Sequence, residues 1–471
     1  MKVSIKEIGF NKTDLEIEKQ VIEEIKMAYS NDERPWIIGY SGGKDSTATL
    51  QLVWYALSGL IERKKLVYVI TSDTLVETPI IARYLEKNIQ NINDVAKKQG
   101  LPITAQKLIP ELNNRFWVNL IGRGYPAPQQ TFRWCTDRLK IATSTKFIKE
   151  KISKYGEAVV VLGTRKNESD SRARVMAEKE IKDNIFSRNS QFSAAFTYAP
   201  IRNWSTWDVW KYLIRVPSPW GNDNEELARM YKNATGECPF VVDDKTPPCG
   251  NSRFGCWVCT LVERDKSMES LVQSSESWLK PLLNYRDFLV TTQDPSSKNL
   301  YREFKRRQGF VSFKSNGSGE ISRGPYTLDF RKELLSRLLK TQKEIQMNDP
   351  GQNIYLISID ELKKIRRIWR TEEGDWEDSI VKIYETIIGR EIIWEKDDIN
   401  PFGKSDKNEL VNICEKNGIP SNLITKLIDI EIKEQGMTRR SSIFSEIDKI
   451  FHEEWRSEDE VKKEYAERKM R

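Results

Sequence analysis

The sequence predicts an α/β fold, in which a doubly wound parallel sheet is followed by a cysteine-rich segment and a helical C-terminal region. Short apolar stretches alternate with longer stretches of helical periodicity over residues 1–216. This alternation is typical of βαβ units and of a parallel sheet. Residues 217–265 are rich in Pro, Gly, Asn and Cys, and residues 266–471 have a mostly helical pattern, with a further boundary expected near 397–407. We therefore expect three segments with these bounds.

The elements of the first segment follow from local patterns. Residues 1–34 have the pattern of a charged amphipathic helix, residues 35–40 (PWIIGY) that of a buried strand, and an apolar-periodic helix reaches about Leu60. Further strands are predicted at 66–70, 101–109 and 158–164. Because the carboxyl ends of the strands meet at one edge of a doubly wound sheet, the functional site is expected at that edge.

Composition narrows the class of protein. A chain of 471 residues exceeds what one hydrophobic core usually serves, and 38% hydrophobic with 31% charged residues indicates a globular protein, not a disordered or collagen-like one. No apolar run approaches the roughly 18 residues of a membrane span, and no signal peptide is apparent, so we expect a cytoplasmic protein without membrane contact. The net charge of +7 permits a polyanionic partner.

The chain has six cysteines and one histidine, His452. A catalytic histidine is therefore nearly excluded for any site outside the C-terminal end. Chemistry must then use carboxylates, cations, backbone amides or thiols. In a reducing cytosol, clustered cysteines bind metal or react more often than they form disulfides.

A phosphate-binding loop is predicted at Ser41–Thr47 (SGGKDST), between a strand and the helix that it opens. Gly42 and Gly43 let backbone amides approach an anion, and a helix N-terminus adds a favourable field. The Walker A pattern is the competing interpretation. It fails because Ile38 stands where its first glycine belongs and Asp45 where its Ser or Thr belongs.

The run SGGKDS resembles the PP-loop of the ATP pyrophosphatase superfamily, which cleaves ATP between the α and β phosphates. Other segments are similar to the sulfonucleotide-reductase branch of that superfamily. They are Asp73–Thr78 (DTLVET), Arg133–Lys140 (RWCTDRLK), Gly163–Arg172 (GTRKNESDSR) and Pro200–Trp210 (PIRNWSTWDVW). In the last segment, Ser205 is expected to cap a helix and the tryptophans to be core residues.

The predicted nucleotide site combines cations with hydroxyls and carboxylates. Guanidinium groups bind phosphate oxygens in pairs, and Asp45 or Asp73 could carry Mg²⁺ beside the polyphosphate of ATP. The expected nucleotide-binding residues are Ser41, Gly42, Gly43, Ser46, Thr47, Asp73, Arg133, Lys140, Gly163 and Arg172. The expected catalytic residues are Lys44, Asp45, Arg165 and Cys238.

The cysteines allow two metal sites, a structural zinc and a 4Fe–4S cluster. Cys256 and Cys259 form a C-x-x-C, whereas Cys414 lies on an apolar helical face and is expected to be a core thiol. The long gap between Cys135 and Cys249 is unlike a zinc ribbon. Resemblance to the iron–sulfur members of the reductase branch implies a cluster on the four ligands Cys135, Cys249, Cys256 and Cys259. Cys238 is left as an alternative ligand or a thiol that carries sulfur.

A longer match is with the DndC family of DNA phosphorothioation proteins. The segments that carry it are Cys249–Thr260 (CGNSRFGCWVCT), Asp265–Met268, Gly324–Thr327 and Arg331–Leu335. The resemblance implies a PP-loop domain, a 4Fe–4S cluster and a helical C-terminal region. It also implies an ATP-dependent sulfurtransferase that replaces a non-bridging phosphate oxygen of DNA by sulfur. A cysteine desulfurase and other Dnd proteins are the implied partners.

Two other functions stay open. A sulfonucleotide reductase would share the PP-loop domain, but thiol-dependent reductases use a cysteine in a C-terminal tail, and no cysteine follows Cys414. A non-catalytic, nucleotide-gated scaffold would link a desulfurase to DNA and use the thiols for structural zinc.

Contact with DNA is predicted for two basic segments that contain aromatic residues. They are Arg302–Phe310 (REFKRRQGF) and Lys363–Arg370 (KKIRRIWR). Solvated helix faces have the same composition, so both interpretations are kept.

Overall fold

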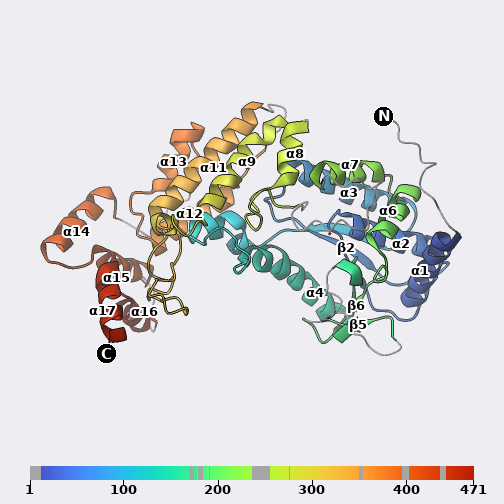
Figure 1. Ribbon diagram of the computed structural model, residues 1–471, viewed down its shortest axis with the longest axis horizontal. Helices are drawn as coiled ribbons and strands as arrows, with labels where there is room; N and C mark the ends of the chain where they lie inside the picture. Colours follow the sequence, from blue (N-terminus) through green and yellow to red (C-terminus); the bar gives the residue numbers. More distant parts are fainter. Residues whose placement is uncertain are drawn as a thin grey trace. The chain divides into compact units, whose positions relative to one another are not determined.

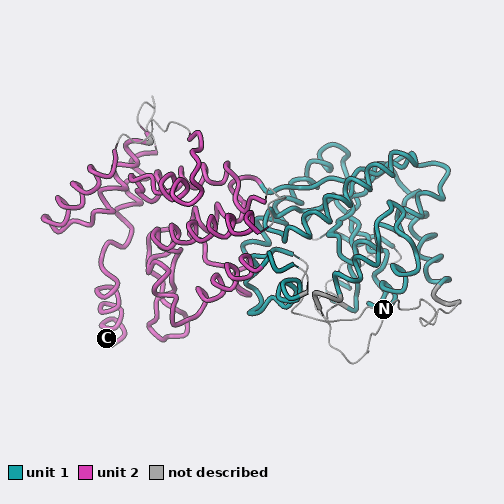
Figure 2. The backbone as a smooth tube through the Cα atoms, turned by 90° about the horizontal axis from the view of Figure 1, so that it is seen from above, with its two compact units in different colours: residues 1–110, 134–279 teal, residues 111–133, 280–471 magenta. Residues whose placement is uncertain are grey.

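The computed structural model describes residues 12–168, 174, 177–178, 184–189, 191–235, 255–274, 276–348, 354–394, 402–434 and 442–470. The chain divides into two compact units (Figure 2). The first comprises residues 1–110 and 134–279, and the second comprises residues 111–133 and 280–471.

Within the described residues, the first unit holds a six-stranded sheet in the order β3-β2-β1-β4-β6-β5. The strands are β1 Trp36–Gly39, β2 Val67–Ser72, β3 Ile103–Leu108, β4 Ala158–Val161, β5 Ser187–Arg188 and β6 Ala195–Tyr198. All neighbouring pairs are parallel except β5 with β6. The strand order reverses direction at β1 and β4, which is where a doubly wound sheet places its ligand crevice.

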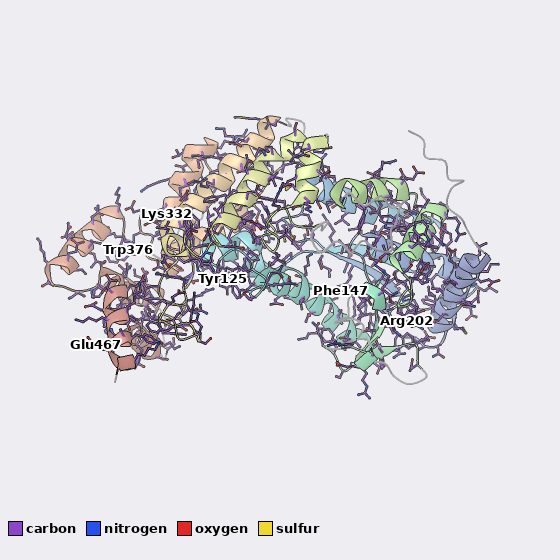
Figure 3. The ribbon with its side chains drawn as sticks, viewed as in Figure 1. Tyr125, Phe147, Arg202, Lys332, Trp376 and Glu467 are labelled. Atoms are coloured by element: carbon purple, nitrogen blue, oxygen red, sulfur yellow. The ribbon has the colours of Figure 1, made fainter. Side chains whose placement is uncertain are left out.

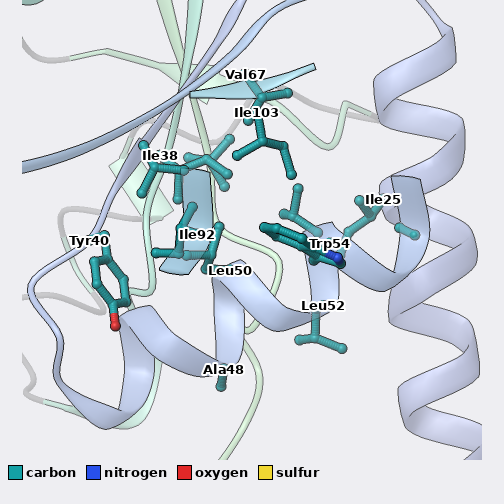
Figure 4. Close-up of a cluster of buried hydrophobic side chains, with 14 of the residues drawn as sticks. Ile25, Ile38, Tyr40, Ala48, Leu50, Leu52, Trp54, Val67, Ile92 and Ile103 are labelled. Carbon is teal, nitrogen blue, oxygen red and sulfur yellow. The ribbon is translucent and has the colours of Figure 1, made fainter. Parts of the chain in front are cut away.

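One face of this sheet is covered by five helices (Figure 1). They are α1 Lys12–Ser30, α2 Lys44–Ser58, α3 Pro79–Lys98, α6 Thr206–Arg215 and α7 Asn224–Thr235. Alternate strand residues such as Ile38 and Val67 point into this core, where they meet Trp54 of α2 and Ile92 of α3 (Figure 4). The strands place alternate side chains on opposite faces, so the same segments also serve the second face.

The opposite face packs against α4, Ala142–Tyr155. Phe147 of α4, labelled in Figure 3, joins a smaller core with Ile37, Val160 and Ile70. Helices on both faces make the sheet doubly wound. The first unit also contains α8 Lys266–Ser274 and the short turns η4 Thr136–Ile141, η5 Lys166–Glu168 and η6 Ser277–Leu279.

The described part of the second unit is mostly helical. Its helices are α9 Lys280–Thr291, α10 Lys298–Tyr301, α11 Leu328–Asn348, α12 Ile359–Glu372, α13 Ser379–Ile388, α14 Lys404–Lys416, α15 Ser421–Glu434, α16 Ile443–Phe451 and α17 Glu458–Met470. The short turns η2 Leu112–Asn114 and η3 Val118–Gly122 belong to the same unit.

Residues 111–133 interrupt the first unit in the sequence but belong to the second unit, where hydrogen bonds hold them in place. The indole of Trp117 donates to the carbonyl of Leu356 at 2.6 Å, and that of Trp369 donates to the carbonyl of Ile121 at 3.0 Å. The buried Arg331 donates to the carbonyl of Gly122 at 2.8 Å. The sequence offers no local signal for this excursion, because the partners lie more than two hundred residues away.

The predicted fold class is confirmed: a doubly wound, largely parallel α/β sheet is followed by a mostly helical C-terminal part. Four predicted strands occur as β1 to β4, each within a few residues of its expected bounds. Ser205 caps α6 in a capping box with Asp208, and Cys414 is buried in α14, both as predicted. Among the described residues, no helix combines the length and apolarity needed to cross a bilayer.

Candidate functional site

The predicted phosphate loop lies at the switch point of the sheet. It joins β1 to α2, and the loop after β4 lies beside it because β1 and β4 are paired in parallel. The loop after β2 follows on the other side of β1. The loops that follow β1, β2 and β4 thus lie at the same edge of the sheet, although they are far apart in the sequence.

The conformation of the loop depends on Gly42. Its φ of +73° is left-handed, and a Cβ there would lie 2.5 Å from Leu85 Cδ2. The hydroxyls of Ser41 and Ser46 lie 3.1 Å apart, and the Ser46 hydroxyl donates to the Gly43 carbonyl at 3.0 Å. These bonds close the loop on itself around the start of α2.

The N-terminus of α2 has the character of an anion site. Gly43 is its N-cap and provides no side-chain acceptor for the amides of the first turn. An amide-lined helix start with a partial positive charge favours an anion such as a phosphate. The Lys44 amide donates to the hydroxyl of Tyr231 at 3.2 Å, and the Lys44 ammonium lies 5.4 Å from the centre of the Tyr231 ring.

Asp45 connects this loop to the one after β4. Its carboxylate accepts from Nε of the buried Arg165 at 2.7 Å and from the ammonium of Lys44 at 3.1 Å. A second Arg165 nitrogen donates to Thr206 Oγ1 at 3.2 Å, at the start of α6. Three of the four predicted catalytic residues, Lys44, Asp45 and Arg165, therefore form one hydrogen-bonded group.

Gly163 allows this approach of the two loops. A Cβ at Gly163 would lie 2.7 Å from the carbonyl oxygen of Asp45 and 3.0 Å from the amide nitrogen of Ser46. Both are backbone atoms at the start of α2, so they cannot rotate away. Glycine is thus required by close packing, and the resemblance to the reductase segment predicted its importance without this reason.

The loop after β2 carries a hydrogen-bonded turn. Asp73 accepts from the Leu75 amide at 2.9 Å and lies 3.5 Å from the Lys107 ammonium. The hydroxyl of Thr74 donates to Glu77 at 2.6 Å, and its amide donates to the same carboxylate at 3.0 Å. Burial raises the pKa of Glu77, although these donated bonds oppose the shift.

This turn reaches the cysteines. Thr74 Oγ1 lies 3.2 Å from Cys256 Sγ, and the Trp257 amide donates to the Val76 carbonyl at 2.9 Å. Glu77 and Cys256 form an isolated antiparallel bridge. The C-x-x-C segment is therefore held against the same loop that follows β2.

Three of the predicted thiol ligands lie in one electrostatic environment. Burial raises the pKa of Cys256 to about 12, and it also raises that of Cys135. The charge of a Cys259 thiolate contributes to both increases, whereas the Lys140 ammonium opposes both. Cys135, Cys256, Cys259 and Lys140 thus act on one another although Cys135 is more than a hundred residues away in the chain.

Three predicted residues fall outside the described part of the chain, and a fourth belongs to the second unit. Cys238, Cys249 and Arg172 lie outside the described residues. Arg133 is exposed, donates to the Gln130 side chain, and ends the segment 111–133 of the second unit. Among the described residues no group of three or more His, Cys, Asp or Glu side chains has the geometry of a metal site.

Two contacts of the site were not anticipated. Tyr231 lies on α7, where its spacing indicates only an amphipathic helix. Thr206 lies in the segment that resembles the reductases, but its role beside Arg165 required the tertiary contact. A side-chain hydroxyl that forms a hydrogen bond with a residue distant in the sequence produces no periodic pattern from which it could be predicted.

Comparisons with known proteins identify two regions. Residues 35–261 match the phosphoadenosine phosphosulfate reductase domain family, from just before β1 to just after Cys259. This match covers a little under half of the chain and includes all six strands of the sheet. Residues 410–452 match a family described as a small protein found in certain Dnd DNA modification systems. These residues run from α14 through α15 to the end of α16.

An uncharacterized protein of Methanocaldococcus jannaschii is 27% identical over 294 residues, which cover 62% of this chain and 50% of the relative. The chain thus spans about half the length of that curated relative. Among solved structures, FMN adenylyltransferase of Candida glabrata matches with a TM-score of 0.29 and 15% identity over 51% of this chain and 72% of the other. The U34-tRNA thiolase NcsA of Methanococcus maripaludis, solved with its 4Fe–4S cluster, matches with a TM-score of 0.28 and 12% identity over 60% and 79%. Similarities at this level support no inference about function.

Proposed function

We propose that the chain is an ATP-dependent sulfurtransferase of DNA phosphorothioation, which activates a DNA backbone phosphate and exchanges one of its non-bridging oxygens for sulfur. The observation that carries the proposal is the contact between two sites. The loop after β2 lies next to the phosphate loop, because β1 and β2 are paired in parallel. The same loop contacts Cys256, where Thr74 Oγ1 lies 3.2 Å from the thiol sulfur. The reductase-domain match over 35–261 and the Dnd-related match over 410–452 support it.

The first step uses the phosphate loop. A phosphate oxygen of DNA attacks the α-phosphorus of ATP, and pyrophosphate leaves. Amides at the start of α2 and the Lys44 ammonium would hold the departing pyrophosphate, with Mg²⁺ beside Asp45 or Asp73. Arg165 would hold Asp45 and, through it, the orientation of Lys44, because both cations bind the same carboxylate.

In the second step a sulfur donor at the hydrosulfide level attacks the activated DNA phosphorus. AMP leaves and carries away the original phosphate oxygen, so one P–S bond forms and one P–O bond breaks. The two steps together consume ATP and a sulfide equivalent and release AMP and pyrophosphate. Activation is needed because an unmodified phosphate oxygen is a poor leaving group.

Cys135, Cys256 and Cys259 are the proposed ligands at three positions of a 4Fe–4S site. Their shared half-buried environment beside Lys140 supports this, although as they stand the three thiols do not have the geometry of a metal site. Cys249 is the proposed fourth ligand, and Cys238 is the proposed thiol that carries sulfur. A persulfide on Cys238 would release its outer sulfur as hydrosulfide when a second thiol, such as the free cysteine of the assay, attacks it and forms a disulfide. A bound cluster would supply or hold sulfur at the sulfide level. Lys140 would favour the thiolate forms, because its charge lowers the pKa of Cys135 and Cys256 against the effect of burial.

The test is product analysis with anaerobically purified full-length protein, ATP, DNA, cysteine and a cysteine desulfurase. AMP and pyrophosphate should accumulate, and nuclease digestion of the DNA should yield phosphorothioate dinucleotides. Asp45→Asn should lower the rate by about a hundredfold or more, as expected for a group that orients charge stabilisation. Lys382→Gln, an exposed cation on α13, is the matched control and should keep the rate.

Formation of ADP and orthophosphate without AMP would contradict the proposed chemistry. The match to the phosphoadenosine phosphosulfate reductase family makes a sulfonucleotide reductase the second candidate. Release of sulfite from phosphoadenosine phosphosulfate with thioredoxin, and no phosphorothioate in DNA, would favour that enzyme. ATP binding without any turnover would favour the scaffold function.

A further inference from the structure

The second unit contains a cavity of about 920 Å³ that is basic in character. We call it the basic groove and define it by Phe132, Lys298, Arg302, Arg306, Phe310 and Arg323. Among the described residues, seven basic side chains line it against one acidic side chain, Glu320. It includes much of the segment Arg302–Phe310, which the sequence analysis singled out for contact with DNA.

Three of these cations have no carboxylate partner in the described part of the chain. Arg302 donates to the carbonyls of Gly324 at 2.7 Å and Arg323 at 2.6 Å, and both acceptors are neutral. Arg306 donates to the Ser322 hydroxyl and to the Arg323 carbonyl, at 3.3 and 3.0 Å. In the part of the chain that the structure describes, the ammonium of Lys298 forms no salt bridge, although the charge of Asp294 acts on it. Among the described residues, Arg302 and Arg306 therefore carry charge that no carboxylate pairs with, whereas Lys298 also has the charge of Asp294 nearby.

The pKa values are consistent with this concentration of charge. Burial is the largest cause that lowers the pKa of Lys298, and the charges of Arg302 and Lys314 lower it further. Burial also lowers the pKa of Arg302, with contributions from Arg306 and Arg323. An anion in the groove would relieve this mutual repulsion.

The remaining basic residues of the groove form ion pairs with carboxylates, and these pairs connect the segments that line the groove. Arg323 donates to both oxygens of Glu458 at 2.8 and 2.6 Å, and Lys462 binds the same carboxylate at 2.6 Å. Lys314 pairs with Glu320, and Arg307 lies 3.7 Å from Glu372. Variants of these residues would disturb the wall as well as the charge.

The backbone around the groove is tightly built. The Glu303 amide donates to the Pro325 carbonyl, and the Gly324 amide donates to the Glu303 carbonyl, each at 2.8 Å. A Cβ at Gly324 would lie 1.6 Å from the Lys305 carbonyl oxygen, so only glycine permits the two chain segments to cross. Arg302 is therefore presented from a fixed position and not from a free loop.

Aromatic faces accompany the cations. Phe132 and Phe310 are 45% and 47% exposed, and both line the groove. Tyr125, labelled in Figure 3, contributes a third ring, over which the Arg307 guanidinium lies at 5.4 Å. Cationic grooves with exposed aromatic rings are typical of sites for single-stranded nucleic acid, where bases stack on the rings and phosphates meet the cations.

The volume of the basic groove restricts the size of the ligand that it can bind. A volume of about 920 Å³ lies in the range of roughly 300–1,000 Å³ of small-ligand pockets, so it admits a few unpaired nucleotides and not two paired strands. We propose that the basic groove binds an unpaired segment of DNA, with its phosphates on Lys298, Arg302 and Arg306 and a base against Phe310. The choice of DNA over RNA rests on the proposed function; the unpaired strand follows from the groove itself.

The experiment measures binding of the full-length protein to a fluorescent oligodeoxynucleotide of about 12 nucleotides, a usual site size for such proteins. Single-stranded DNA, the same sequence as duplex, and single-stranded RNA are compared across a salt series. The double variant Lys298→Gln/Arg306→Gln should bind the single strand at least tenfold more weakly. The slope of log affinity against log salt should fall by about 0.7 for each lost phosphate contact.

Matched variants separate the groove from general charge and apolarity. Lys382→Gln/Lys404→Gln removes two exposed cations of the second unit that lie near Glu377, and it should leave affinity and slope unchanged. Phe310→Leu should weaken single-strand binding about tenfold through lost stacking. Phe444→Leu, at an 81% exposed position on α16, should not. Circular dichroism melting of every variant verifies folding.

The proposal is overturned if the groove variant binds like the control variant, if duplex binds as tightly as the single strand, or if RNA binds more than tenfold more tightly than DNA. A wild-type protein that binds in the groove but forms no phosphorothioate would refute the proposed function and keep this inference. If the protein forms phosphorothioate and the groove variants bind DNA as tightly as the wild type, the inference about the groove is refuted and the proposed function is kept.

Discussion

At the scale of residues, the candidate nucleotide site depends on a few close contacts between loops. Asp45 accepts from Arg165 and Lys44, and Gly163 lets the loop after β4 reach the first turn of α2. The charged residues were predicted from motifs, whereas the reason for Gly163 is steric. A Cβ at that position would contact backbone atoms that have no alternative position without a shift of α2.

Gly163→Ala is therefore expected to destabilise the first unit by about 1–3 kcal/mol, the usual cost of forcing an extra methyl into a packed region. It should also lower pyrophosphate release from ATP, because it displaces Asp45 from Arg165. Urea unfolding and a pyrophosphate assay measure the two effects.

Gly403→Ala is the matched control, since a Cβ at Gly403 would meet only Asp406 Oδ2 at an ordinary 3.7 Å. It should leave both quantities nearly unchanged. Full stability and activity of Gly163→Ala would show that the two loops can separate without cost.

At the scale of elements, two basic segments of similar composition have different environments. The segment Lys363–Arg370 lies on α12, where Arg366 and Arg370 both donate to Asp378, at 2.6 and 3.0 Å for their closest contacts. Ile365, Ile368 and Trp369 of the same helix are buried. Its charges thus hold α12 to neighbouring structure, whereas the acceptors of Arg302 and Arg306 within the described ranges are all neutral. Composition alone did not separate these cases, because carboxylate partners come from elsewhere in the chain.

The helix α15 offers a pH-dependent test of packing. Burial raises the pKa of Asp429 from 3.8 to about 6, although the Trp376 indole donates to it at 3.1 Å. A raised folded-state pKa favours the protonated form, so its stabilising effect is present below about pH 4 and is lost as pH rises through about 6. The charged carboxylate destabilises the second unit at neutral pH.

Asp429→Asn keeps an acceptor for Trp376 and removes the titration. We expect it to raise the free energy of unfolding by about 1 kcal/mol more at about pH 7.5 than at about pH 5, after allowance for partial solvent screening. Urea unfolding at the two pH values measures the difference. Asp329→Asn, at a 97% exposed side chain, should change stability by less than about 0.5 kcal/mol at either pH. Equal effects of the two substitutions would contradict the assigned cause.

At the scale of the whole molecule, the main result is that cysteines far apart in the sequence share one electrostatic environment. Cys135 follows the segment 111–133 of the second unit, whereas Cys256 and Cys259 come after the last strand of the sheet in the sequence. Their shared environment beside Lys140 makes an iron–sulfur site testable without any assay of activity.

Anaerobically purified protein is expected to contain about four irons per chain with matching acid-labile sulfide. Cys135→Ser, Cys256→Ser and Cys259→Ser should each lose most of the iron and the visible absorbance. Cys414→Ala changes a buried thiol of α14 and should retain both. One zinc per chain in place of iron would refute the cluster and favour the scaffold function.

Local periodicity predicted the α/β class and the first four strands, and the structure confirms both. The short motifs of the phosphate loop and of the cysteines predict a site, and its function stays a prediction. The folded structure was needed to show that residues 111–133 belong to the second unit and that Thr74 lies against Cys256. It was also needed to show that Arg302 and Arg306 line a groove in which, among the described residues, they have no carboxylate partner. The difference lies in the separation along the chain of the residues that interact. Periodicity reports the face that one element buries, whereas hydrogen bonds and charge neutralisation depend on residues that approach only after the chain has folded.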